Sequence, residues 1–192
     1  MNKTRKDLRW VLFAGMFASS ATVLAQTPGA DLAMTFNADR TNPVNGTNSW
    51  LKGGSIELGA NAWHGLGIAA RVTGLTTSAI GSQTVPLNLV LATFGPRYSW
   101  ILAPASKHSI SLYGEALIGE ANGFKGLFPA TGGVISSSNA FALNVGGGVD
   151  YSLGRYFAYR LVETNWTRTQ FQNGTTNVQS YLQLGSGVVV RF

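Results

Sequence analysis

Apolar and polar residues alternate along the last eleven positions of the chain, and the alternation stops on an aromatic ring. One face of this segment carries Leu182, Leu184, Ser186, Val188, Val190 and Phe192, and the other carries Gln183, Gly185, Gly187, Val189 and Arg191. Period-two alternation predicts a β-strand with one apolar face. A chain that ends on such a strand is typical of a β-barrel in lipid, where the last strand pairs with the first and leaves no open edge.

The same alternation recurs upstream and predicts an all-β chain of about eight antiparallel strands. The expected strands lie at about 32–39, 55–62, 66–73, 87–100, 110–118, 141–151, 156–168 and 182–192. In the fourth strand, Leu87, Leu89 and Leu91 are expected on the apolar, lipid-facing side. In the seventh, Arg160 and Glu163 cannot share a face by strict alternation, so either a bulge intervenes or Glu163 points outward near a rim.

The predicted connections alternate between short and long. Short ones are expected around His64-Gly65, at 103–107 and at Leu153-Gly154-Arg155, and longer, more polar ones at 40–49, 74–86, 120–138 and 170–177. Short turns at one end and long loops at the other are typical of bacterial outer-membrane barrels, and an even strand number places both termini at the short-turn, periplasmic end. The pattern therefore predicts an eight-stranded, antiparallel, up-and-down transmembrane β-barrel.

Composition indicates which strand face meets lipid. Only 11% of the residues are charged, 24 are glycine and none is cysteine. The polar faces are rich in small residues and have almost no lysine, which suits the narrow interior of an eight-stranded barrel better than a surface in water. Two interfacial girdles are expected, with Trp63, Trp100, Tyr151, Phe157 and Phe192 near the short turns and Trp50, Phe141 and Trp166 near the long loops. The alternative is that these rings belong to an ordinary core.

Residues 1–25 have the pattern of a secretory signal peptide. A basic start precedes an apolar run of about 15 residues from Trp10 to Leu24, and the expected cleavage site lies between Ala25 and Gln26. The alternative is a single membrane anchor, but a spanning helix needs about 20 apolar residues. We therefore expect a signal peptide at 1–25 and a barrel domain at 26–192. From Gln26 onward, ten Lys/Arg and seven Asp/Glu form no basic run, so no nucleic-acid partner is expected.

Four segments support a resemblance to a known family. They are Thr93-Phe94-Gly95-Pro96-Arg97-Tyr98, Gly146-Gly147-Gly148-Val149-Asp150, Tyr159-Arg160-Leu161-Val162-Glu163 and Gly187-Val188-Val189-Val190-Arg191-Phe192. On these segments the chain resembles the small eight-stranded outer-membrane β-barrels related to the transmembrane domain of outer membrane protein A. The resemblance implies insertion by the outer-membrane assembly machinery of the Gram-negative cell envelope, which reads a final strand ending in phenylalanine, here Val188, Val190 and Phe192. We expect no peptidoglycan-binding domain, because the chain ends with its barrel.

Charged residues on the inward faces form a candidate ion-pair network in the lumen, made up of Glu57, Arg71, Glu115, Asp150 and Arg160. The two shortest hairpins place Glu57 opposite Arg71 and Asp150 beside Arg160. Opposite charges on neighbouring strands attract each other, and more strongly where water is scarce. The pairs either exchange partners as a gate for ions or fill the lumen as a static plug, and the narrow bore of eight strands favours the plug.

The sequence offers little support for catalysis. The only histidines, His64 and His108, lie at predicted short turns, far from the outer leaflet where lipid-modifying barrel enzymes act. Adjacent residues such as His108 and Ser109 point to opposite faces of a strand. Metal ligands are sparse, and the glycine clusters lack the spacing of a phosphate-binding loop. We therefore expect no enzyme activity, metal or cofactor.

These observations predict a non-enzymatic integral protein of the bacterial outer membrane, with a structural or surface-interaction role and a mostly plugged polar lumen. Its expected partners are outer-membrane lipid, the assembly machinery and, through the long loops, an extracellular partner. One alternative is an adhesin acting through the loop 120–138, where Phe124, Leu127 and Phe128 are expected to be exposed. The others are a narrow porin-like channel and a soluble periplasmic barrel that binds lipid.

Overall fold

The computed structural model describes residues 29–41, 49–80, 85–102, 108–130, 133–172 and 177–192. These residues form eight strands and no helix. The strands are β1 (Ala30–Thr41), β2 (Ser49–Trp63), β3 (Leu66–Ile80), β4 (Val85–Leu102), β5 (Ile110–Ala130), β6 (Gly133–Ser152), β7 (Phe157–Thr169) and β8 (Gln179–Arg191). Among the described residues, no helix is long and apolar enough to cross a membrane.

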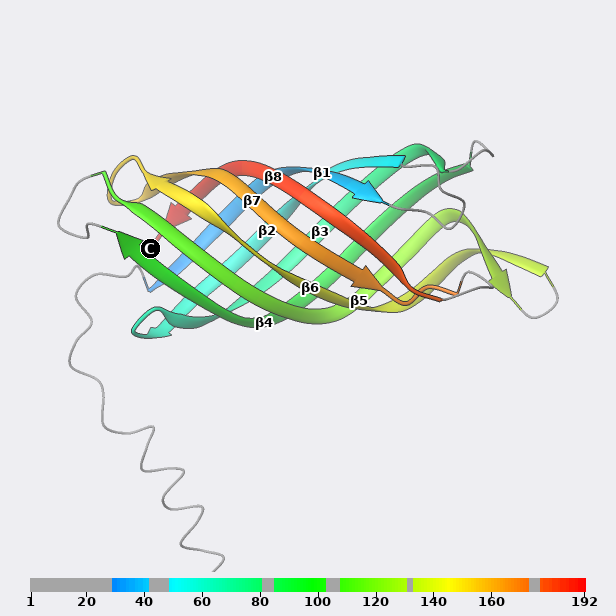
Figure 1. Cartoon of the computed structure of the whole chain (residues 1–192), viewed down its shortest axis with the longest axis horizontal. Helices are drawn as coiled ribbons and strands as arrows, with labels where there is room; N and C mark the ends of the chain where they lie inside the picture. Colours follow the sequence, from blue (N-terminus) through cyan, green and yellow to red (C-terminus); the bar gives the residue numbers. More distant parts are fainter. Residues whose placement is uncertain (1–28, 42–48, 81–84, 103–107, 131–132, 173–176) are drawn as a thin grey trace, which may run out of the picture.

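Each strand pairs antiparallel with the next, and β8 closes the sheet by pairing with β1. The closing register runs from Asp31 opposite Arg191 to Thr41 opposite Tyr181, so both edges are paired along almost their whole length. Figure 1 shows the resulting barrel with its strongly tilted strands. The predicted all-β, eight-stranded, up-and-down barrel is therefore confirmed.

The short-turn end carries a two-residue connection. His64 and Gly65 join β2 to β3 with φ values of 48° and 87°, the left-handed geometry of a two-residue hairpin turn. A Cβ atom on Gly65 would also lie only 2.2 Å from the backbone oxygen of Ser99. Both the positive φ and this close approach therefore favour glycine at position 65. β1 begins and β8 ends at this end of the barrel (Figure 1), as the even strand number predicts.

The strands continue farther toward the long-loop end than expected. β3 extends to Ile80, and β5 and β6 leave only residues 131–132 between them. The predicted extents of the loops 74–86 and 120–138 are therefore wrong. Figure 1 shows that the β5–β6 hairpin reaches beyond the other strands at this end.

Polar pairing explains why the sequence pattern missed these extensions. On the outer face of the barrel, the Thr76 hydroxyl donates to Asn88 at 2.7 Å, and Asn122 donates to Asn139. At the start of β6, residues 133–137 are all exposed, so hydrogen bonding continues there while the apolar–polar alternation ends. A prediction based on alternation stops where the apolar belt stops.

An apolar belt covers the outside of the barrel. Ile68, Phe36 and Phe94 are 67%, 66% and 65% exposed, and the charged residues Glu57, Arg71 and Arg160 are at most 2% exposed. The exposed aromatics include Trp63, Trp100, Phe157 and Phe192 near the short-turn end and Trp50, Phe141 and Trp166 toward the other. In water such a belt would be an aggregation surface, whereas hydrocarbon solvates it. The predicted lipid-facing sense is confirmed, and the soluble periplasmic alternative is wrong.

The outer part of the interior is apolar, contrary to the prediction of a uniformly polar lumen. Leu89 and Leu91, expected to face lipid, are 1% and 5% exposed and point inward. The β4 register explains the error, because Thr93 and Arg97 share their face and fix its direction. The apolar cluster that they join consists of Leu51, Leu75, Leu89, Leu91, Ala121, Phe128, Ala140, Ala142, Phe171 and Tyr181.

A bulge in β7 resolves the phase conflict between Arg160 and Glu163. Leu161 and Val162 are both exposed, and the register against β8 shifts between Arg160 and Glu163. The extra residue brings both charged side chains to the inside of the barrel, where each is 0% exposed. Of the two predicted solutions, the bulge is correct.

Candidate functional site

Arg71 lies at the centre of the lumen and joins three carboxylates. It stands opposite Glu57 across the β2–β3 pair, and its Nε donates to Glu57 Oε2 at 2.7 Å. Its Nη2 lies 2.7 Å from Glu115 Oε1 on β5, and its Nη1 lies 3.1 Å from Glu163 Oε1 on β7. One guanidinium therefore links four strands of the barrel from the inside, in the planar geometry that suits Arg–carboxylate contacts.

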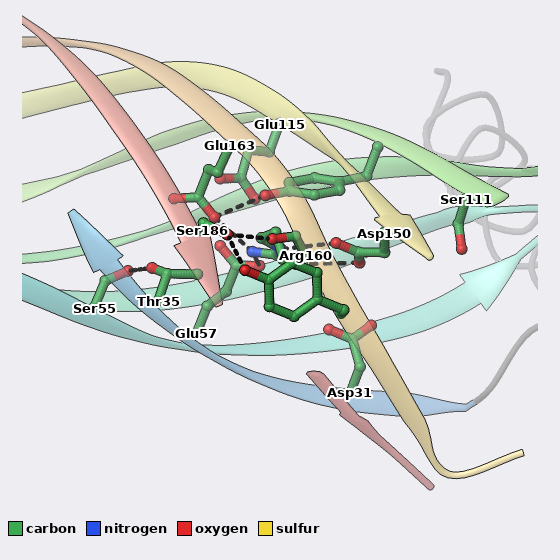
Figure 2. A network of polar contacts seen from close by, with 12 residues as sticks. Asp31, Thr35, Ser55, Glu57, Ser111, Glu115, Asp150, Arg160, Glu163 and Ser186 are labelled. Atoms are coloured by element: carbon green, nitrogen blue, oxygen red, sulfur yellow. Dashed lines mark hydrogen bonds and ion pairs between the residues drawn. The ribbon is translucent and has the colours of Figure 1, made fainter. Parts of the chain in front are cut away.

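Arg160 forms the second centre. Its Nε lies 2.9 Å from Asp150 Oδ1, and its Nη1 lies 2.6 Å from Glu163 Oε2 and 3.2 Å from Glu57 Oε1. Figure 2 shows Arg160 between Asp150 on one side and Glu57 and Glu163 on the other. Glu57 and Glu163 are thus shared by Arg71 and Arg160, which makes the two centres one network.

Arg97 on β4 extends this network toward the short-turn end. Its Nη1 lies 2.9 Å from Asp31 Oδ1 on β1 and 3.2 Å from Glu57 Oε1. The ring of Tyr113 lies 4.3 Å from the guanidinium carbons of both Arg97 and Arg160, and its hydroxyl donates to Glu163 at 2.8 Å. Cation–π contact and ion pairing therefore act on the same arginines.

We refer to these side chains together as the central network: Asp31, Glu57, Arg71, Arg97, Tyr113, Glu115, Asp150, Arg160 and Glu163. Its members come from all strands except β8. Each is buried, so each carboxylate needs a cationic partner inside the barrel. The network spans the lumen, with contacts that join β1 to β4 and β2 to β7.

Two small chambers lie on either side of the central network. The chamber toward the long-loop end is lined by polar groups that include Asp39, Asn144 and Gln183. The lining of the chamber toward the short-turn end includes Ser99, Ser111 and Arg191. Each has room for about one water molecule. Gln183 donates to Asp39 at 3.1 Å, and Arg191 donates to Ser111 at 2.8 Å. The central network lies between the two chambers.

The structure brings together all five residues that the sequence proposes for the lumen: Glu57, Arg71, Glu115, Asp150 and Arg160. The sequence reasoning missed Asp31, Arg97, Tyr113 and Glu163 as members. Tyr113 lies on the inward face of β5, and its contacts to Arg97 and Arg160 cross the lumen. Such contacts depend on the closure of the barrel. They cannot be predicted by counting residues from a hairpin turn, which identifies only partners on adjacent strands.

The proposed assembly residues lie at the end of β8. Phe192 and Val188 are exposed on the lipid-facing side and Val190 is half-buried. The proposed cleavage site between Ala25 and Gln26 lies outside the described residues.

The histidines lie outside the lumen. His64 packs its ring 4.9 Å from that of Trp63, and His108 stacks 6.0 Å from Tyr151, both at the short-turn end. Within the described ranges, no three residues of the His, Cys, Asp or Glu type are arranged to hold a metal. The geometry here supports ion pairing and filling of space rather than proton transfer to a substrate.

Comparisons with known proteins agree with this fold. No family model matches the sequence, and no curated protein matches it. The fold is similar to the crystal structure of Neisserial surface protein A, with a TM-score of 0.56 and 17% identity over 85% of this chain and 97% of that one. It is also similar to Ail, the attachment invasion locus protein of Yersinia pestis, in complex with the heparin analogue sucrose octasulfate, with a TM-score of 0.52 and 15% identity over 85% and 99% of the two chains. The chain therefore has the fold of a small outer-membrane barrel.

The closed sheet, the apolar belt and the polar centre place the protein in the bacterial outer membrane. Every spanning strand is paired on both sides around the ring, and lipid requires such pairing of backbone groups. In barrels of this kind the short turns face the periplasm and the longer connections face the outside. The end where β1 begins and β8 ends is therefore the periplasmic one, and the β5–β6 hairpin lies at the opposite, outer end.

Proposed function

We propose that the protein is a non-enzymatic outer-membrane barrel with a closed lumen, which acts through its surface. The observation that carries this proposal is the central network, in which buried arginines and carboxylates from seven strands contact one another across the whole interior. The apolar cluster at the outer end is a second barrier, because it offers ions no polar partner. Because a closed interior transports nothing, we infer a role that is structural or that depends on contacts at the surface.

Planar-bilayer recording tests this proposal. The folded barrel is expected to give no steady ion current above that of a protein-free bilayer, because the network and the apolar cluster block the same path. Glu57→Gln is expected to remain closed, because the apolar cluster is untouched. Steady current through the unaltered protein, lost on heat unfolding, would contradict the closed lumen.

A narrow channel is the rival for the same site, and one feature favours it. Glu57 contacts Arg71, Arg97 and Arg160 at once, so it could exchange partners without losing its charge compensation. In that case, brief openings would occur in the unaltered protein, and Glu57→Gln would change their frequency. The same recordings therefore distinguish the two functions.

Surface recognition through the β5–β6 hairpin is the second candidate function. Leu127 and Val134 are each 61% exposed at its tip, and Ile135 beside them is also exposed. The expected exposure of Phe128 is wrong, because it is buried against Phe171 with ring centroids 5.4 Å apart, and Phe124 is half-buried. An exposed apolar tip, on a hairpin whose Phe128 packs against Phe171, is suited to contact a partner outside the cell.

Export and assembly are part of the same proposal. We propose that 1–25 acts as a signal peptide, that cleavage falls between Ala25 and Gln26, and that the assembly machinery reads Val188, Val190 and Phe192. The support is the basic and apolar pattern of the first segment and the position of the last strand, which closes the barrel against β1.

A further inference from the structure

The outer surface of the barrel has an unequal distribution of charge. Six of the seven described acidic residues are buried inside, and only Glu120 on β5 is exposed. Five described basic residues are exposed: Arg40, Lys52, Lys125, Arg155 and Arg168. The surface that faces lipid and solvent is therefore basic, although the interior contains more carboxylates than arginines.

Three of these basic residues lie on the outside of four consecutive strands of the ring, β7, β8, β1 and β2. Arg40 on β1 pairs with Trp50 on β2, and Lys52 lies two positions further along β2, so Arg40 and Lys52 are diagonal neighbours about 7–8 Å apart, with their Cβ atoms somewhat closer. Arg168 on β7 lies on the other side of β8 from Arg40. It pairs with Ser180, two positions from Leu182, which pairs with Arg40. In Figure 1 the strands β7, β8, β1 and β2 lie side by side.

The side chains of these three residues point away from the lumen. Their neighbours Asp39, Leu51, Thr167 and Thr169 are buried inside, and strand alternation turns Arg40, Lys52 and Arg168 outward. None of the three forms an ion pair within the part of the chain that the structure describes. The sequence segments 41–50 and 169–182, which continue from these strands, contain no acidic residue.

The three residues lie at the outer border of the apolar belt. Trp50 and Trp166 flank them on the same face, and both are exposed aromatics of the kind that lie at headgroup level. Lys52 also pairs with Thr76, which begins the polar Thr76–Asn88 contact beyond the belt. This border is where lipid headgroups meet the barrel, on the side that faces the outside of the cell.

We propose that Arg40, Lys52 and Arg168 form a binding site for the phosphate groups of an outer-leaflet glycolipid. Unpaired cations at headgroup depth match a phosphate-bearing headgroup in charge, and Arg and Lys both bind phosphate oxygens strongly. The acyl chains of the same lipid would lie on the belt below, against Leu182 and Leu184 of β8. The inference rests on the barrel's position in a bilayer and is independent of whether the lumen conducts.

Native mass spectrometry of the refolded barrel in detergent tests this site. The probe is bisphosphorylated lipid A, compared with the same lipid after removal of both phosphates. The double variant Arg40→Gln/Arg168→Gln is expected to weaken binding of the phosphorylated lipid about tenfold or more, since each basic residue near an anionic headgroup adds to the attraction. Binding of the dephosphorylated lipid is expected to be equal for both proteins.

A matched control separates the site from general charge. Lys125→Gln/Arg155→Gln removes the same charge at the hairpin and at a periplasmic turn, and is expected to change the affinity less than about twofold. Equal weakening by the two double variants would overturn the proposal, and so would equal binding of lipid with and without phosphates. Displacement of the lipid by millimolar inorganic phosphate would reassign the site to a free anion. A heat-modifiable gel shift confirms that every variant is folded.

Discussion

Replacing Arg160 by leucine is expected to lower the free energy of unfolding of the barrel by about 3–5 kcal/mol. Arg160 is fully buried and compensates Asp150, Glu163 and Glu57 at once, so its loss leaves carboxylates in the interior with too little positive charge. Arg160→Lys keeps the charge but not the planar guanidinium, and is expected to lower the free energy of unfolding by less than Arg160→Leu does.

Urea unfolding of the refolded protein, followed by tryptophan fluorescence, measures this effect. The control is Arg155→Leu, which removes an exposed arginine in the neighbouring turn and is expected to change the free energy by less than about 0.5 kcal/mol. If the two variants were equally stable, the central network would contribute nothing beyond the filling of space.

Placing an arginine on the lipid-facing side at mid-depth is expected to cost about 2–4 kcal/mol of stability. Ile56 is suited to this test, because it is 54% exposed, pairs with Met34 and Val72, and lies between the two aromatic girdles. The guanidinium of Ile56→Arg would have to remain in hydrocarbon or distort the bilayer to reach water.

The same substitution on the hairpin serves as the control. Ile135 is also an exposed apolar residue, but β6 carries it beyond the belt. Ile135→Arg is expected to cost no more than about 1 kcal/mol. Both variants are measured by unfolding in lipid vesicles, and a cost at Ile56 no greater than that at Ile135 would mean that the belt does not face lipid.

The interior combines two kinds of closure at different depths. Charged groups fill the middle, where an arginine can reach carboxylates from several strands. Apolar side chains fill the outer end, where Phe128 and Phe171 pack together. The first kind specifies one arrangement of side chains through directional contacts, and the second excludes water from it.

Local pairing was the part of the site that the sequence could predict. Glu57 faces Arg71 because the two-residue turn at His64-Gly65 sets their register, which alternation and turn chemistry reveal. The contact between Arg97 and Asp31 joins β4 to β1 across the lumen. It depends on the barrel's diameter and strand tilt, which no single segment encodes.

Ambiguous faces account for the errors in the fold. Near Leu89 and Leu91 both faces of β4 are apolar, since Val90 is also exposed to lipid, so alternation could not assign a direction. In the β6 part of the β5–β6 extension, residues 133–137 are all exposed, so alternation was missing there although the strands pair. Strand phase was predictable where one face is polar and the other apolar, and not elsewhere.

Spin-label accessibility along β3 tests the central claim most directly. The native chain has no cysteine, so single cysteines at Ile68, Ala69, Val72 and Thr73 can be labelled one at a time in lipid vesicles. The labels at Ile68 and Val72 are expected to collide freely with oxygen dissolved in the bilayer, and those at Ala69 and Thr73 to be shielded inside the barrel. The reverse pattern would show that the apolar residues fill the interior and would contradict a barrel that faces lipid.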